Sequence, residues 1–200
     1  NFHVLYKELL NFCTVDLSSF YFDIRKDTLY CENKDSQKRK DCILVLNIIL
    51  DCLLKWFAPI LSFTTEEIFK LLNNENDNSI HLMQFPKINE NWKNDKLKQD
   101  WTNLIQIRNV VNSSIEKKRE DKTIGSSLEA KVKIELGKMF FDLAKSHNFS
   151  EICITSDADL VLNEDIGDEI KVETIKAEGE KCPICWKISK NKCIRHGHIT

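Results

Sequence analysis

The fold class of this chain is decided by residues 96–136, which read KLKQDWTNLIQIRNVVNSSIEKKREDKTIGSSLEAKVKIEL. In the first part of this stretch, apolar residues recur every three or four positions, which is the spacing of one face of an α-helix. The positions on that face are Leu97, Trp101, Leu104, Arg108, Val111 and Ile115. We therefore expect a long helix from about Lys96 to Arg119, with this stripe turned inward.

After Gly125 the period of the apolar residues changes from about 3.6 to about 2. Val132, Ile134 and Leu136 alternate with charged residues, as in a strand with one buried face. The residues that follow predict a short helix around Met139 to His147 and strands at 152–154, 160–162 and 170–176. This second part is therefore predicted to be a small α/β unit.

Upstream of residue 96 the pattern is helical. Residues 1–30 predict two helices, with Asp16 or Ser18 as the N-cap of the second. Because the first helix has no cap of its own and no initiator methionine, we expect Asn1 to be a cut point in a longer protein. Residues 37–57 predict a mostly buried helix that ends before Pro59. Thr64 and Glu67 fit a capping box for a further helix at 66–72, and residues 80–94 are expected to be extended or irregular.

These patterns predict a mainly α fold in which a helical bundle is followed by a small α/β unit and a knuckle-like tail. The domain boundaries expected from the sequence are 1–122 for the helical domain, 123–176 for the α/β junction domain and 177–200 for the tail.

The composition is that of a soluble chain with a core, since 42% of the residues are hydrophobic and 30% are charged. No stretch is apolar enough to cross a membrane, and no signal sequence opens the chain. Five of the eight cysteines stand singly among apolar residues, as reduced thiols do in a cytoplasmic protein. The net charge is −2, so binding to nucleic acid has to depend on local basic patches.

The other three cysteines belong to the strongest motif in the chain. Cys182 and Cys185 are separated by two residues, and so are Cys193 and His196. Two such pairs can grip a tetrahedral Zn2+ from both sides, because a tight turn aims both side chains of a pair at one point. We therefore predict a structural zinc site, with His198 as an alternative fourth ligand. The other interpretation is that these residues are free thiols in a frayed tail.

The tail around this motif is basic, since residues 181–200 contain no acidic residue. Trp186 has two interpretations: it caps a small hydrophobic core in the knuckle, which we favour, or it offers a face on which a base stacks. The basic residues that we expect to contact phosphates are Lys187, Lys190, Lys192 and Arg195.

Five other basic residues are weaker candidates for RNA contacts. Lys38 and Arg39 open a helix, whereas Lys117 and Arg119 end one, where the helix dipole alone favours cations. Arg108 stands within an apolar stripe, so pairing with a buried carboxylate is favoured over contact with RNA. No arrangement of residues typical of a catalytic site or of a Gly-rich phosphate loop occurs in the sequence.

Four stretches together resemble the isoleucyl-tRNA synthetases. Residues 11–31 resemble the start of that family's anticodon-binding domain, and residues 56–68 are similar to the helical corner that follows. Residues 124–130 resemble the end of that domain, and residues 178–186 resemble the entry to the family's terminal zinc finger. The valyl and leucyl enzymes share the helical domain, so the zinc-finger entry favours isoleucine.

The resemblance implies a bundle and finger that hold the anticodon arm of isoleucine tRNA. The parent enzyme would join isoleucine to its tRNA with ATP and Mg2+, acting as a monomer in the cytoplasm. Its His-Ile-Gly-His and Lys-Met-Ser-Lys-Ser motifs do not occur in these residues, so this piece alone is not expected to aminoacylate. The zinc-binding motif from Cys182 to His196 is also shorter than the family's usual finger, with His196 where a cysteine commonly stands.

Three other functions stay open at this point. The chain fits a non-enzymatic zinc-ribbon adaptor that binds protein, which its negative net charge would suit. It also fits the equivalent region of a valyl- or leucyl-tRNA synthetase, or a standalone tRNA-binding factor.

Overall fold

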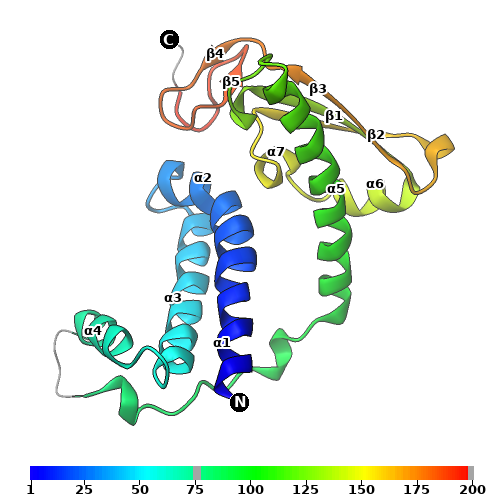
Figure 1. Ribbon diagram of the computed structural model, residues 1–200. Coiled ribbons are helices and arrows are strands. Elements are labelled where there is room, and N and C mark those ends of the chain that lie inside the picture. Colours follow the sequence, from blue (N-terminus) through cyan, green and yellow to red (C-terminus); the bar gives the residue numbers. More distant parts are fainter. Residues whose placement is uncertain (74–77, 198–200) are drawn as a thin grey trace. The chain divides into compact units, whose positions relative to one another are not determined.

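The computed structural model describes residues 1–73 and 78–197 and divides into two compact units, residues 1–93 and 94–200. Figure 1 shows helices in the first unit and a long helix with a small sheet in the second. The predicted fold class, a helical part followed by a small α/β unit and a knuckle, is confirmed. None of the described helices has the length and apolar character needed to span a membrane.

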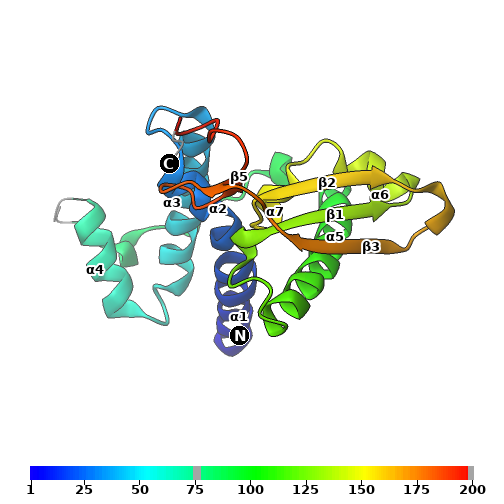
Figure 2. The same cartoon turned by 90° about the horizontal axis from the view of Figure 1, so that it is seen from above.

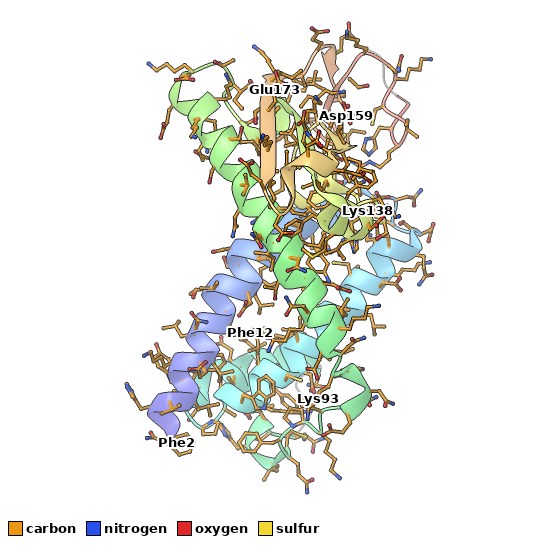
Figure 3. The ribbon with its side chains drawn as sticks, turned by 90° about the vertical axis from the view of Figure 1, so that its right-hand side faces the viewer. Phe2, Phe12, Lys93, Lys138, Asp159 and Glu173 are labelled. Carbon is orange, nitrogen blue, oxygen red and sulfur yellow. The ribbon has the colours of Figure 1, made fainter. Side chains whose placement is uncertain are left out.

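The first unit opens with one uninterrupted helical rod. It consists of α1 (Phe2–Asn11), the π-helical segment η1 (Phe12–Phe22) and α2 (Asp23–Cys31), and Figure 3 shows Phe2 and Phe12 along it. The predicted break at Asp16 or Ser18 is wrong, because both residues lie inside the π-helical segment. The side chain of Asn1, which was expected to lack a capping role, accepts a hydrogen bond from the backbone N–H of His3.

Two further helices follow, α3 (Gln37–Phe57) and α4 (Ser62–Leu72). The prediction that α3 is mostly buried is wrong, since only Cys42, Cys52 and Leu54 are buried on it and Leu44 is 59% exposed. The capping box is also wrong, because α4 begins at Ser62, before the predicted cap.

The first unit has a small core where α3 meets α4. Leu54, Ala58 and Ile80 are buried there, and Ile68 and Phe69 pack against them. The segment after α4 is irregular, as predicted, and contains only the short turns η2 (Ile80–Leu82) and η3 (Glu90–Trp92) among the described residues.

The second unit is built on α5 (Asp95–Glu120), whose first turn is capped by the side chain of Asn94. Leu104, Val111 and Ile115 of the predicted stripe are buried, and Trp101 packs against the same core; Ile107, which was not predicted, is buried as well. Leu97 is the exception, because its side chain is 51% exposed.

The sheet of the second unit has the order β2-β1-β3, and Figure 2 shows β1 between its two neighbours. β1 (Ala130–Leu136) pairs in parallel with β2 (Asp157–Leu162) and antiparallel with β3 (Ile170–Lys176). Figure 3 labels Asp159 and Glu173, which flank Lys133 on either side in this register. The predicted strands at 160–162 and 170–176 are therefore confirmed.

Two short helices, α6 (Lys138–Ala144) and α7 (Phe149–Ile152), connect β1 to β2. The strand predicted at 152–154 is wrong, because Ile152 ends α7 and Ile154 has a φ of 56°. A positive φ is a strained backbone for a β-branched residue and cannot continue a strand.

The α5 helix shares its core with the strands, and its buried residues lie in one cluster with Val132, Ile134 and Leu136. This explains why the boundary between the compact units falls between Lys93 and Asn94, whereas the change of period suggested 122/123. The helical spacing identified the buried face of α5, but spacing does not tell which neighbour covers that face.

Candidate metal centre and nucleic-acid interface

The tail of the second unit folds into a short hairpin, which we call the knuckle (residues 177–197). β4 (Glu180–Lys181) pairs antiparallel with β5 (Ile188–Ser189). Gly179, at the entry, has a φ of 119°, and a Cβ placed there would lie 2.2 Å from the carbonyl oxygen of Ser189. Only glycine allows the two backbone segments to approach this closely at the start of the hairpin.

Backbone hydrogen bonds shape both halves of the knuckle around its cysteines. In the first half, the N–H of Cys182 donates to the carbonyl of Lys187, and the N–H of Trp186 donates to the carbonyl of Cys182. In the second half, the carbonyl of Cys193 accepts from the N–H groups of His196 and Gly197. Each turn thus brings the two side chains of one pair together.

The four predicted ligands form one cluster, as the spacing indicated. The ligand atoms of Cys182, Cys185, Cys193 and His196 all lie within 4.8 Å of one another. The sulfur atoms of Cys185 and Cys193 are 3.8 Å apart, and Nδ1 of His196 lies 3.5 Å from the sulfur of Cys182 and 3.4 Å from that of Cys193. His198, the alternative fourth ligand, lies outside the described residues.

These distances suit a tetrahedral metal ion. With metal–sulfur bonds of about 2.3 Å and a metal–nitrogen bond of about 2.0 Å, the edges of the tetrahedron are about 3.8 Å between sulfurs and about 3.5 Å between sulfur and nitrogen. The three separations given above match these values, and the donor set of three thiols and an imidazole is one that soft and borderline metals prefer. The cluster can therefore hold a metal ion.

The surroundings of the cluster lower the pKa of two of its three cysteines and raise that of the third. Burial opposes ionisation of Cys182, but hydrogen bonds from the backbone N–H groups of Cys185 and Ile184 outweigh it and lower the pKa of Cys182 to about 6. Burial likewise opposes ionisation of Cys193, yet backbone hydrogen bonds lower its pKa. Burial raises the pKa of the Cys185 thiol to about 11, so this residue would need the charge of a metal ion to ionise at neutral pH.

Trp186 does not form the small hydrophobic core that we favoured from the sequence. Its side chain is 58% exposed, and the ammonium group of Lys181 lies 5.2 Å from the centre of its ring. The residue also has a φ of 63°, imposed by the tight turn between Cys182 and Lys187. The ring is thus presented at the surface of the knuckle.

The predicted phosphate-binding residues of the tail differ in their surroundings. Lys187 is half-buried and donates to the hydroxyl of Ser150 at 3.0 Å, whereas Lys190 pairs with Glu178. Lys192 and Arg195 are exposed. A cavity of about 220 Å³ gathers three of these lysines beside two of the metal ligands. Its lining includes Lys181, Lys187, Lys190, Lys192, Cys182 and Cys193.

Lys181 is a candidate that the sequence interpretation left out of the binding site. It lines this cavity and also stacks on Trp186, so it contributes to both features. Its position directly before Cys182, the first metal ligand, could have identified it from the sequence.

Arg108 occupies a structural position inside the second unit. It is half-buried on α5, and its Nε donates to the carbonyl oxygen of Ile152 at 2.9 Å, at the end of α7. This nitrogen of Arg108 thus binds a backbone carbonyl. Burial raises the pKa of the adjacent Cys153 to about 12, although the charge of Arg108 opposes that shift.

The basic residues at the helix ends are surface groups with local partners. In the first unit, Lys38 is exposed, and Arg39 donates to the carbonyl of Leu29 at 3.0 Å, which links the start of α3 to α2. In the second unit, Lys117 is exposed, and Arg119 pairs with Glu116 at 2.7 Å. Arg39 therefore has a structural role.

Comparison with known proteins places these features in a family. Residues 1–134 match the family described as the anticodon-binding domain of tRNA ligase. The chain is 61% identical to an isoleucine–tRNA ligase of Pelagibacter ubique over 98% of its own length and 21% of the relative's. It is 41% identical to isoleucine–tRNA ligases of Agrobacterium fabrum, over 94% of this chain and 20% of the relative, and of Brachyspira hyodysenteriae, over 92% and 21%.

The chain thus spans about a fifth of the length of these curated relatives. The family match covers the whole helical unit, α5 and the first part of β1. The chain belongs to the family of anticodon-binding domains of tRNA ligases.

Proposed function

We propose that this chain is the part of an isoleucine–tRNA ligase that binds the anticodon arm of isoleucine tRNA. The observation that carries the proposal is the extent of the similarity. The family match ends at residue 134, whereas the isoleucine–tRNA ligase of Pelagibacter ubique is similar over 98% of this chain, a span that has to include most of the α/β unit and the knuckle. The resemblance to the isoleucine enzymes therefore extends to the region that the general family match leaves out.

The metal held by the knuckle is proposed to be Zn2+, with Cys182, Cys185, Cys193 and His196 as its ligands. Three sulfurs and an imidazole nitrogen at tetrahedral spacing support this choice. Four protein ligands leave no open position for a substrate, so the ion would stabilise the knuckle and would take no part in catalysis.

The proposed RNA surface is centred on the knuckle. Trp186 offers an exposed ring for base stacking, and the neighbouring lysines offer charge for phosphates. The residues proposed to contact the anticodon arm are Lys38, Arg39, Arg108, Lys117, Arg119, Trp186, Lys187, Lys190, Lys192 and Arg195. Within this set, Arg39 and Arg108 are the weakest candidates, because each is half-buried and already binds a backbone carbonyl.

The parent enzyme is proposed to attach isoleucine to its tRNA, using ATP and Mg2+ at a catalytic site outside these residues. We also propose that it acts as a monomer in the cytoplasm. The rest of the synthetase would then be a partner of the first unit, whose exposed apolar side chains include Phe63 at 93% exposure. Apolar surface of this kind commonly marks a contact with another part of a protein.

A binding experiment on the zinc-loaded chain tests the proposal. We expect it to bind an isoleucine tRNA transcript more tightly than valine or leucine transcripts. The logarithm of the affinity should fall linearly with the logarithm of the salt concentration, since phosphate contacts release counterions. Equal affinity for the three transcripts would contradict the assignment to isoleucine, and the absence of salt dependence would contradict RNA binding by the basic tail.

A further inference from the structure

Ser156 joins three segments of the second unit through one hydroxyl group. It lies between α7 and β2, directly before Asp157. Its Oγ donates to the carbonyl of Leu128 at 2.5 Å and accepts from the N–H of Ile188 at 2.6 Å. A serine hydroxyl has one hydrogen and two lone pairs, so both bonds can form at once. Leu128 lies in the turn η4 (Ser127–Glu129) before β1, and Ile188 begins β5 of the knuckle, which Figure 2 shows close to the start of β2.

The peptide group between Lys187 and Ile188 connects this hydroxyl to the metal cluster. The carbonyl of Lys187 accepts from the N–H of Cys182 at 2.9 Å, while the N–H of Ile188 donates to Ser156. Because the peptide group is planar, its C=O and N–H directions are fixed relative to each other. The bond from Cys182 therefore fixes the direction of the Ile188 N–H, so Ser156 accepts from a donor whose orientation is set by the metal-binding turn.

The metal itself has no means of orienting the knuckle on the α/β unit. All four ligands lie within residues 182–196, so binding of an ion closes the knuckle only on itself. Its attachment to the α/β unit depends on other contacts. Ser156 holds β5, Lys187 donates to Ser150, and the N–H of Ala177 donates to the carbonyl of Glu129 at 2.7 Å.

We propose that Ser156 is a positioning residue that fixes the direction of the knuckle relative to the sheet and thereby presents Trp186 and Lys192 to RNA. The inference rests on the proposed function, since it explains how the exposed ring and the lysines of the knuckle keep one direction. Among these contacts, that of Ser156 reaches β5, the strand that leads from the first pair of ligands towards the second.

The test compares three variants of the zinc-loaded chain. Ser156→Ala removes both hydrogen bonds, Ser156→Thr keeps the hydroxyl, and Ser146→Ala is the matched control, because Ser146 bonds only near its own helix. In Ser156→Ala we expect faster hydrogen exchange at the Ile188 amide and an affinity for isoleucine tRNA that is lower by about tenfold. The zinc content and the resistance to a chelator should stay as in the unchanged chain. Ser156→Thr should recover the affinity, and Ser146→Ala should not change it.

Two results would overturn the proposal. If Ser156→Ala binds tRNA as tightly as the unchanged chain, the direction of the knuckle does not depend on Ser156. If it loses zinc in proportion to its loss of affinity, Ser156 supports the fold of the metal centre itself. Failure of the unchanged chain to bind tRNA would instead contradict the proposed function. The exchange rate at Ile188 would then decide the role of Ser156, with faster exchange in Ser156→Ala supporting the attachment and an unchanged rate refuting it.

Discussion

The two units of this chain bury their apolar residues to very different degrees. In the second unit, Ala130, Val132, Ile134 and Leu136 along β1 are completely buried, and one face of α5 closes over the sheet. In the first unit, buried side chains are scattered along the helices, while large apolar residues of α3 and α4 are exposed. The helical unit thus buries its apolar side chains less completely than the unit in which helices pack on a sheet.

The difference teaches where each unit obtains its stability. A strand with alternating residues turns every second side chain to the same face, so α5, α6 and α7 together cover one face of the sheet. The helices of the first unit carry apolar residues around much of their circumference, as α3 does, and need neighbours on several sides. We therefore expect the second unit to be stable by itself and the first to depend on further contacts.

Removal of the metal should give the largest effect and should be confined to the second unit. Structural zinc supplies about 10–16 kcal/mol of apparent free energy in finger peptides, so chelation should unfold the knuckle. We expect rapid proteolysis of residues 177–197 after chelation, with little loss of the helical circular dichroism signal. Cys182→Ser should reproduce this result, whereas Cys13→Ser, in the first unit, should leave the zinc content unchanged. A general loss of helix on chelation would show that the knuckle supports more of the fold than we infer.

The second-largest effect should be a difference in stability. Truncating an apolar side chain should lower the free energy of unfolding more in the second unit than in the first. Ile134 is fully buried, so Ile134→Ala should lower the free energy of unfolding of the second unit by about 2–5 kcal/mol. Leu44→Ala should lower that of the first unit by less than about 1 kcal/mol, because more than half of Leu44 is already in solvent. Hydrogen exchange under increasing urea measures both units in one experiment. Equal destabilisation by the two changes would remove the distinction between the units.

Neutralising basic residues should weaken RNA binding more in the second unit than in the first. Replacing Lys187, Lys190, Lys192 and Arg195 by glutamine should reduce the magnitude of the slope of log affinity against log salt by at most about 3.6, since each lost contact removes about 0.7–0.9. In the full-length enzyme, charging of tRNA should fall while isoleucyl-adenylate formation persists. Lys38→Gln, in the first unit, serves as the matched single change and should alter the slope by less than about one unit. A fourfold variant that charges normally at limiting tRNA would contradict the role of the tail.

The smallest effect should appear in acid, again in the second unit. A hydrogen bond from Lys131 holds the pKa of Asp157 below its ordinary value of 3.8, and one from Lys133 holds that of Glu135 below 4.5. A lowered pKa gives stability that is present above the ordinary value and is lost as the pH falls through the folded one. Lys131→Met should therefore make the unfolding free energy less dependent on pH below about 4. Because the groups are largely exposed, an effect that exceeds that of Ile134→Ala would contradict this ranking.

The fold was predictable from sequence where the period was regular. The strands at 160–162 and 170–176 and the long helix near Lys96 follow directly from alternating and helical spacing. The break expected at Asp16 or Ser18 failed because polar residues that commonly cap helices also occur within a π-helical segment. The strand expected at 152–154 failed because a short apolar run fits a buried turn of helix as well as a strand.

The metal cluster was predictable because ligand spacing alone determines which side chains a tight turn brings together. The surroundings of Trp186 were not, since the exposure of its ring depends on a backbone with positive φ, for which the sequence gives no sign. The partners of Arg39 and Arg108 were missed for a related reason. Backbone carbonyls accept hydrogen bonds at any residue type, so no sequence pattern marks them.

The order of strands in the sheet has a consequence for synthesis on the ribosome. The α5 helix packs on β3, which begins at Ile170, about fifty residues after α5 ends at Glu120. At about 5–20 residues per second, the apolar face of this helix has to wait roughly 3–10 s before its last covering strand has been translated. During that interval the nascent chain offers a hydrophobic helix to chaperones, and a slow stretch of codons between these two elements would lengthen its exposure.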